Sequence, residues 1–541
     1  MIFEAKKHVG NMRKILLILL ILPFVGSAQI VSQVGFNCVN STISFTTQAD
    51  SNYLLELVPE GGSFAWRDRY DKLNEDPQDV INLYKFMQRN NRSFWVIFVA
   101  SDSVPMSQNI SAIYQLKAAG VPVRAAAYVN EPFYPAGGYS FNFSLYETGY
   151  LDFCNQITSN WPDMDILLPI APKPLSIFTK TQGGQSSHDN WNNSGFNFKS
   201  EHPEFKIVGG DVHIYYTGAF VQALGVTATT DEVGAEKAKT TLPKDRVYNP
   251  SDTTDEKYWR DIYYQSQPAV FWEVMLNYLQ SHNLTGYVTE CGYIDAGSLN
   301  GTWTYAAKAF ELMNWYGNDE RLSSFNWHGG VITQSTVGVV APRKSFDIQD
   351  PENPNNCRSA TFDAFCLYFN TQGQRLPYSY QIVSEGVYSL WYLTESEFTP
   401  VFSLPEGLQA TYKVEYIKGQ RFSSLSRSMD FCKKQSILGN EIEKGEGLVC
   451  PAYSFGYIVL EVTKVDVFGC KNPNASNFNP AATIDDGSCE ILGCTDYAAS
   501  NFNPEANVDN GSCVYPICYQ KRWLFKSLPC KISKSNNCNC K

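Results

Sequence analysis

The stretch that decides the fold lies early in the chain and reads Phe94-Trp95-Val96-Ile97-Phe98-Val99-Ala100. This nearly unbroken apolar and β-branched run is expected for a strand that is buried on both faces. A helical pattern follows at residues 110–119 and ends at Gly120, a natural position for the end of a helix. A second apolar strand over residues 121–129 completes a βαβ unit, whose two strands pair in parallel.

The same alternation extends in both directions from this unit. It predicts strands at residues 62–66, 165–171, 205–216, 285–289 and 322–327, and helices at residues 79–88, 145–159, 257–280 and 304–316. A polar insertion at 173–204 and a long segment at 217–256 are predicted to be rim loops. Residues 43–47 or 53–58 supply an eighth strand, the first in the chain, and eight parallel strands favour an α/β fold of the (β/α)8 (TIM) barrel type. No Gly-x-Gly-x-x-Gly motif follows the first strands, which argues against a dinucleotide-binding sheet.

The pattern changes after about residue 336. Alternating segments at 378–383, 386–393, 410–417 and 457–462 are separated by turn residues, which is typical of antiparallel strands. We therefore expect a catalytic barrel over residues 29–335, followed by an antiparallel β-sandwich domain over residues 336–465. Residues 30–47 are a further candidate for a strand of that sandwich.

Residues 466–515 contain two copies of a Cys-, Asn- and Asp-rich repeat with a period of 24 residues. Modules this short cannot bury a core and need a disulfide or an ion. The repeats are similar to those near the C-termini of secreted bacterial surface proteins and enzymes, which implies a stalk or spacer. Residues 516–541 are a basic, Cys-rich tail for which the sequence indicates no function.

Two hypotheses for the repeats stay open. Each copy is either a turn stapled by a disulfide or a site for structural calcium, because carboxylates supply the hard oxygen ligands that calcium prefers. The candidate ligands are Asp485, Asp486 and Asp509. Their spacing does not match that of an EF-hand loop.

The N-terminus predicts a secretory signal peptide over residues 1–28. Met12-Arg13-Lys14 precedes an apolar run at 15–25 and the small residues Gly26-Ser27-Ala28. That run is too short for a bilayer, which takes roughly 20 residues, and no transmembrane segment is expected elsewhere. The 15 cysteines suit an oxidising compartment. We expect a protein that is secreted or attached to the cell surface.

The charge balance argues against nucleic acid as a partner. The chain has 43 Lys and Arg residues against 54 Asp and Glu residues, so its formal net charge is −11. The only basic block of the mature region lies in the C-terminal tail. A surface of this sign repels phosphate backbones.

Polar residues at the ends of apolar strands are the candidates for chemistry, because active sites of α/β barrels lie at the C-terminal ends of the strands. Asn130 and Glu131 follow the fourth predicted strand, and Glu290 ends the seventh. His213 and Tyr215 lie at the end of the sixth, and Trp327 ends the eighth; the candidate residues are Asn130, Glu131, His213, Tyr215, Glu290 and Trp327.

This set resembles the clan of retaining (β/α)8 glycoside hydrolases over about residues 45–335. The resemblance implies that Glu131 is the acid/base, that Glu290 is the nucleophile, and that Asn130 binds the sugar 2-hydroxyl. It further implies that Tyr215 contacts the nucleophile beside His213, and that Trp327 forms the floor of the sugar subsite. The substrate would be a polysaccharide or oligosaccharide, and the reaction would require no cofactor and no metal.

The requirement for two carboxyl groups is independent of the family. Glycosidic cleavage needs one protonated group that gives a proton to the leaving oxygen and one ionised group that attacks the anomeric carbon. Retention of configuration places the two about 5 to 5.5 Å apart. The pattern therefore predicts a retaining hydrolase, although neither composition nor spacing names the sugar.

Alternatives exist for single residues and for the whole chain. Asn130-Glu131-Pro132 can be an ordinary turn, His213 a structural histidine, and Trp327 a core residue. Arg67 has two interpretations, a contact with the nucleophile as in several families of that clan or a surface ion pair with Asp68. The alternative function is a catalytically inactive barrel that binds carbohydrate or mediates adhesion at the cell surface. A serine hydrolase is disfavoured because no Gly-x-Ser-x-Gly elbow follows a strand.

Overall fold

The structure is a computed structural model that describes residues 31–37, 54–70, 77–134, 137–172, 184–215, 268–292, 303–328, 360–422, 424 and 442–515. Within these ranges, no helix combines the length and apolar character needed to cross a membrane. The chain divides into two compact units, of which the first contains the barrel and the second the C-terminal modules.

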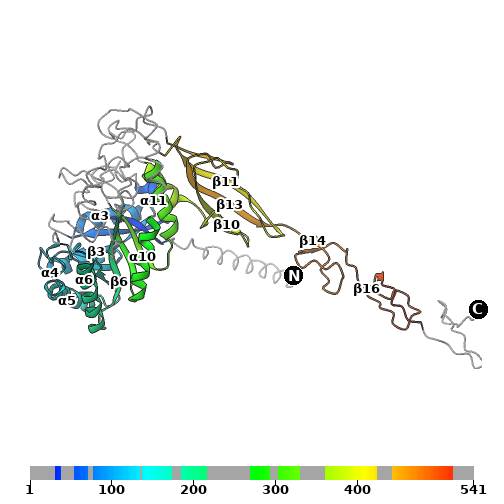
Figure 1. The fold of residues 1–541 in the computed structure, drawn as a ribbon, viewed down its shortest axis with the longest axis horizontal. Coiled ribbons are helices and arrows are strands. Elements are labelled where there is room, and N and C mark those ends of the chain that lie inside the picture. Colours follow the sequence, from blue (N-terminus) through cyan, green and yellow to red (C-terminus); the bar gives the residue numbers. More distant parts are fainter. Residues whose placement is uncertain are drawn as a thin grey trace, which may run out of the picture. The chain divides into compact units, whose positions relative to one another are not determined.

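The first unit contains a closed barrel of eight strands in sequence order, as predicted. Figure 1 shows this part of the chain in colours from blue to green. All of its strand pairs are parallel. The strands are β1 (Val31–Asn37), β2 (Ser63–Arg69), β3 (Ser93–Ala100), β4 (Val123–Tyr128), β5 (Asp165–Pro169), β6 (Ile207–Tyr215), β7 (Thr285–Gly292) and β8 (Leu322–His328). The apolar runs form these strands because their side chains are buried on both faces of the sheet.

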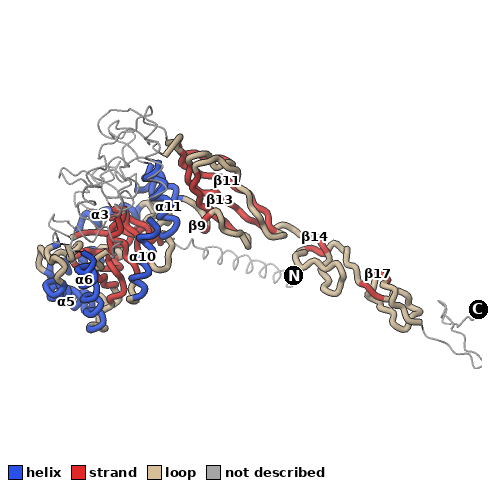
Figure 2. The backbone as a smooth tube through the Cα atoms, viewed as in Figure 1, coloured by secondary structure: helices blue, strands red, loops and turns tan. Residues whose placement is uncertain are grey.

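Helices connect the strands and flank them, as Figure 2 shows. They are α3 (Pro77–Arg89), α4 (Met106–Ala118), α5 (Phe143–Asn160), α6 (Gly184–Glu201), α10 (Pro268–Ser281), α11 (Trp303–Tyr316) and α12 (Ala360–Asn370). The predicted helices 79–88, 110–119, 145–159 and 304–316 are confirmed. The predicted helix 257–280 begins at Pro268 among the described residues, and its earlier part lies outside them.

The first barrel strand differs from the prediction. It is β1, which pairs with both β2 and β8, so residues 31–37 belong to the barrel and not to a sandwich. Residues 54–57 are helical, and the candidate 43–47 lies outside the described residues. Burial of Val34 and Phe36 drives the placement of β1. Gly35 allows the close approach to β2, because a Cβ there would lie 1.9 Å from the Ala65 carbonyl oxygen.

The polar insertion at 173–204 contains a helix, α6, where a loop was predicted. Its buried face consists of a few large side chains in a polar sequence, so composition concealed it. Trp191 is fully buried, and its Nε1 donates to the carbonyl of Pro169 at 2.9 Å. Asn192 pairs with both backbone groups of Ala171, at 2.8 and 3.0 Å. These contacts dock α6 onto the end of β5. The predicted loop 217–256 lies outside the described residues.

The barrel also continues past the predicted boundary at residue 335. The ring of Phe365 in α12 lies 5.5 Å from Phe36 of β1 and 5.7 Å from Trp327 of β8, measured between centroids. Asn370 at the end of α12 donates to the carbonyls of Glu56 and Leu57. Helix α12 therefore takes the place of the eighth barrel helix.

The β domain consists of one five-stranded sheet in the order β12-β11-β13-β10-β9. Its strands are β9 (Gln374–Pro377), β10 (Gly386–Thr394), β11 (Leu408–Lys418), β12 (Glu443–Gly447) and β13 (Ser454–Lys464). The strands predicted at 386–393, 410–417 and 457–462 are confirmed, whereas 378–383 is not a strand. Tyr380 and Val383 are exposed, so that segment does not bury an alternating face.

A sandwich needs a second sheet, and the described residues of 360–465 do not provide one. A helix of the barrel covers this sheet instead. The ring of Phe310 in α11 lies 5.1 Å from both Phe455 and Tyr457 of β13. The Tyr457 hydroxyl donates to Asn314 Oδ1 at 2.6 Å. Burial against α11 replaces burial against a second sheet.

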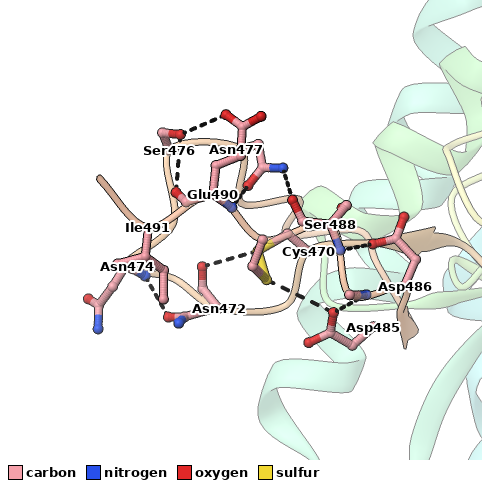
Figure 3. The surroundings of a disulfide bond; sticks show 12 residues. Cys470, Asn472, Asn474, Ser476, Asn477, Asp485, Asp486, Ser488, Glu490 and Ile491 are labelled. Atoms are coloured by element: carbon pink, nitrogen blue, oxygen red, sulfur yellow. Dashed lines mark hydrogen bonds between the residues drawn. A yellow bond between two sulfur atoms is a disulfide. The ribbon is translucent and has the colours of Figure 1, made fainter. Parts of the chain in front are cut away.

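The second unit contains two C-terminal modules, each closed by a disulfide. Cys470 pairs with Cys489, and Cys494 pairs with Cys513. Figure 3 shows the first, where the Asn477 side chain donates to the Ser488 carbonyl at 2.6 Å; Asn501 makes the equivalent bond in the second module at 2.7 Å. Short parallel pairs complete the modules, namely β14 (Phe468–Gly469) with β15 (Ile484–Asp485) and β16 (Leu492–Gly493) with β17 (Val508–Asp509).

Candidate active site

A cluster of charged side chains lies at the C-terminal ends of the barrel strands. Arg67 comes from β2, His213 from β6 and Glu290 from β7, while Asn130 and Glu131 follow β4. Arg67 Nη1 donates to Glu290 Oε1 at 2.6 Å, and its Nη2 donates to Asn130 Oδ1 at 2.6 Å. Three predicted residues, Asn130, His213 and Glu290, thus contact one arginine, and Glu131 joins them through His213.

A bulge in β7 turns Glu290 into the barrel. Val288 pairs with Val212 of β6, but Glu290 pairs with the next residue, His213, so Thr289 is an extra residue in β7. The pairing of β7 with β8 shifts at the same place, since Val288 pairs with Phe325 and Cys291 with Trp327. Strict alternation would point Glu290 to the opposite side from Thr289. The bulge lets both face inward.

The loop after β4 holds Glu131 in an unusual backbone conformation. Val129 has φ 63° and Glu131 has φ 46°, both in the left-handed region that L-residues seldom occupy. Strain of this kind persists only where the surroundings impose it, and it is concentrated at functional sites. Gly137 contributes to that constraint, because a Cβ there would lie 2.2 Å from the Glu131 carbonyl oxygen. Gly137 was not among the predicted site residues, although the Gly137-Gly138 pair marks a tight segment.

Arg67 contacts the proposed nucleophile, which settles its two interpretations. The side chain is fully buried, and its ion pair is with Glu290, whose side chain is 6% exposed. A buried guanidinium is always charged and strongly favours the ionised form of a carboxylate beside it. Arg67 therefore belongs to the site, although the predicted catalytic set did not include it.

His213 bridges the two glutamates. Its Nδ1 lies 2.8 Å from Glu131 Oε1 and 3.3 Å from Glu290 Oε2, and its Nε2 lies 3.4 Å from Arg67 Nη2. Burial by itself would lower the pKa of His213. The charges of Glu290 and Glu131, with the hydrogen bond to Glu131, outweigh burial and the opposing charge of Arg67, so the pKa of His213 is raised above its usual 6.5.

The two glutamates have different surroundings. Glu131 keeps a side-chain exposure of 31%, against 6% for Glu290. Carboxylate oxygens of Glu131 and Glu290 and a ring nitrogen of His213 all lie within 4.8 Å of one another. The two carboxylates therefore lie close together, on either side of His213.

The same three side chains could in principle ligate a cation. However, Arg67 donates directly to Glu290 and lies beside His213. A metal ion bound between them would face a buried guanidinium at close range, and like charges in a low dielectric repel strongly. The arrangement is therefore that of an ion-pair network.

Three other residues of interest lie close by in the fold. Tyr215 is the last residue of β6, and its side chain lies outside the described part. Trp327 is fully buried against Tyr305 and Phe365, and a sugar-stacking role for it stays a prediction. Cys291 is also buried, and burial with the nearby charge of Glu290 raises the pKa of its thiol well above the usual 9.0. The protonated thiol is a poor nucleophile.

No protein-family model matches the chain, and no curated protein matches it in sequence. Among solved structures, it is similar to a monomeric beta-xylosidase from Caulobacter crescentus CB15, with 12% identity, a TM-score of 0.43, and coverage of 79% of this chain and 95% of that chain. It is also similar to a GH39 enzyme from Xanthomonas axonopodis pv. citri, with 11% identity, a TM-score of 0.44, and coverage of 79% of this chain and 94% of that chain. A third similar structure is a GH51 alpha-L-arabinofuranosidase from Thermotoga petrophila RKU-1, with 9% identity, a TM-score of 0.37, and coverage of 72% of this chain and 78% of that chain. Similarity of this size identifies no function, so the case for one rests on the residues of the site.

Proposed function

We propose that this chain is a retaining glycoside hydrolase that cleaves O-glycosidic bonds of a polysaccharide or oligosaccharide. One observation carries the proposal. Glu131 and Glu290 present carboxylate oxygens within 4.8 Å of each other, at the strand ends of an eight-stranded parallel barrel. A double displacement at an anomeric carbon uses two carboxyl groups held close together, about 5 to 5.5 Å apart, and this pair is close in the same way.

The different environments of the two glutamates support different roles for them in this proposal. Glu290 is buried against Arg67, which keeps it ionised and able to attack. Glu131 is partly exposed, so water reaches it, and it lies 2.8 Å from His213. Glu290 is therefore the nucleophile in this proposal, and Glu131 is the acid/base.

The reaction then has two steps. In the first, a Glu290 oxygen bonds to the anomeric carbon while the glycosidic C–O bond breaks, and Glu131 gives its proton to the leaving oxygen. In the second, Glu131 takes a proton from water, the water oxygen bonds to the anomeric carbon, and Glu290 leaves as carboxylate. Asn130 would bind the 2-hydroxyl and Tyr215 would contact Glu290. Trp327 is fully buried against Tyr305 and Phe365 and therefore has no contact with substrate in this mechanism. No cofactor takes part in either step.

We further propose that the protein is secreted, with residues 1–28 as its signal peptide, and that residues 466–515 act as a spacer, for instance to a cell surface. Structural calcium in the modules stays a prediction. The side chains concerned already hold turns, since Asp485 Oδ1 accepts from the Gly487 amide at 3.0 Å and Asp509 Oδ1 from the Gly511 amide at 2.9 Å. These bonds favour the stapled-turn hypothesis.

The test is release of reducing sugar from a panel of polysaccharides and aryl glycosides by the parent, Glu131→Gln and Glu290→Gln. We expect one substrate class to be cleaved and both variants to lose nearly all of the activity. Azide should restore turnover of Glu290→Ala and yield a glycosyl azide of inverted configuration, because azide replaces the missing nucleophile. Glu273→Gln is the matched control, since Glu273 also binds an arginine, Arg321, outside the site.

Two outcomes would contradict the proposal. If both variants cleave as fast as the parent, the chemistry lies elsewhere. If the parent cleaves nothing but binds a glycan in a sedimentation or glycan-array assay, the chain is a catalytically inactive carbohydrate-binding or adhesion protein.

A further inference from the structure

A second buried pair lies inside the barrel beside the charged cluster. The Thr289 hydroxyl donates to Asp211 Oδ1, and the two residues belong to the neighbouring strands β7 and β6. Thr289 is fully buried and Asp211 is 5% exposed. No catalytic step proposed above uses either residue.

Asp211 faces the barrel interior on the same side of β6 as His213. Gly209, two residues before Asp211, faces inward, because a Cβ there would meet Leu167 and Tyr287 of the barrel core. Side chains two residues apart on a strand share a face. A carboxylate in such a place is costly unless it is hydrogen-bonded, so its retention calls for an explanation.

Thr289 is the extra residue of the bulge that turns Glu290 into the site. A bulge leaves its extra residue without a place in the strand ladder, so something else must fix its orientation. The hydrogen bond from Thr289 to Asp211 ties this residue to β6 immediately before His213 pairs with Glu290. We propose that Asp211 and Thr289 are positioning residues, which form a clasp that locks the β7 bulge and so holds Glu290 against Arg67 and His213.

The expected loss of kcat rests on the proposed function. The expected movement of Glu290 does not. Thr289→Val keeps the shape of the side chain and removes its hydroxyl. The hydrogen bond that joins the bulge to Asp211 is then lost. Misplacing a reacting group by about 1 Å costs about 100-fold in rate. We expect Thr289→Val to lower kcat on the cleaved aryl glycoside about 100-fold with KM unchanged, and Thr289→Ser to restore most of it.

A second measurement is independent of any substrate. Glu290 and Glu131 are the anions that raise the pKa of His213, and Arg67 opposes them. If Glu290 moves away in Thr289→Val, the pKa of His213 should fall. Titration of protein labelled at the histidine Cε1 atoms, followed by NMR, measures this shift, and the signal is assigned by its loss in His213→Gln.

Thr371→Val is the matched control. The Thr371 hydroxyl is also buried and pairs with Ser389 Oγ at 2.7 Å, in a pair that contacts none of the five cluster residues. We expect it to leave kcat and the pKa of His213 as in the parent, even if both variants lose similar stability.

Each result decides the inference. A lower kcat with a lower His213 pKa in Thr289→Val, both restored in Thr289→Ser, supports the clasp. A Thr289→Val variant with parental kcat and parental His213 pKa overturns it, and so does a loss of kcat without a change in that pKa. If the parent cleaves no glycoside, the proposed function fails, and the histidine titration alone still decides whether the clasp holds Glu290.

Discussion

Replacement of Arg67 by methionine tests the whole charged cluster. Methionine fills a similar volume and removes both donors, to Glu290 and to Asn130. The expected loss has two parts, because the residue supports both the fold and the ionised form of Glu290.

The magnitude follows from burial. The Arg67 and Glu290 side chains are 0% and 6% exposed, so solvent screens the pair little. Removal of one partner of a buried ion pair costs about 3–5 kcal/mol of unfolding free energy. Loss of a preorganised charge at a reaction centre lowers kcat by about 10² to 10³. Arg67→Lys should fall between parent and Arg67→Met, since one ammonium lacks the planar fork that reaches both partners.

The assays are urea unfolding followed by tryptophan fluorescence, kcat on the cleaved aryl glycoside, and the His213 titration. Arg67 lowers the pKa of His213, so Arg67→Met should raise that pKa further. Arg321→Met is the control. Arg321 pairs with Glu273 and Asp319 but is 20% exposed, and it should cost less stability and leave kcat unchanged. An Arg67→Met protein with parental stability and parental kcat would refute this account of the site.

Three further predictions follow from particular contacts. Gly137→Ala should lower kcat by about 100-fold, because the new methyl displaces the Glu131 carbonyl. Gly195→Ala should leave kcat unchanged, because its methyl meets side chains, Leu168 at 3.2 Å and the Phe143 ring at 3.4 Å. The pKa of His213 in the folded protein is above 6.5, so its contribution to stability is complete below pH 6.5 and disappears as the pH rises through the folded pKa. Thermal unfolding at several pH values should show that the stability difference between parent and His213→Gln shrinks over that range. A constant difference would contradict the raised pKa. A Cys494→Ser, Cys513→Ser protein lacks the Cys494–Cys513 disulfide, which should lower the stability of the module by about 3 kcal/mol and be seen as fast proteolysis near residue 500. Resistance of the parent to proteolysis in the presence of EDTA would show that calcium is not needed. Parental resistance of the variant without the disulfide would contradict the stapled-turn hypothesis.

The barrel was predictable because its strands bury both faces. Runs such as residues 94–100 are apolar without interruption, and the helices between them show the helical period. The prediction failed for β1 and α6, where few large apolar side chains are buried. In β1 only Val34 and Phe36 carry the signal, and in α6 the buried Trp191 lies within a polar sequence. Local pattern cannot reveal such elements, because their burial depends on tertiary partners.

Four members of the charged cluster were predictable from the sequence, but the geometry that brings them together was not. Glu131 and Glu290 follow from the rule that chemistry lies at strand ends. The bulge at Thr289 leaves no mark in composition, yet it decides whether Glu290 faces inward. The role of Arg67 likewise depends on which strand end it faces, which only the closed barrel determines.

The charges around Glu131 and Glu290 differ, which supports the different roles of the two glutamates in the proposed mechanism. Arg67 carries a fixed positive charge, and it binds Glu290, so this pair is neutral with Glu290 ionised. His213 can hold one proton 2.8 Å from a Glu131 oxygen. The raised pKa of His213 keeps that proton in the site. In the proposed mechanism, transfer of this proton to Glu131 would supply the proton that the first step consumes, while Glu290 stays paired with Arg67 as the proposed nucleophile.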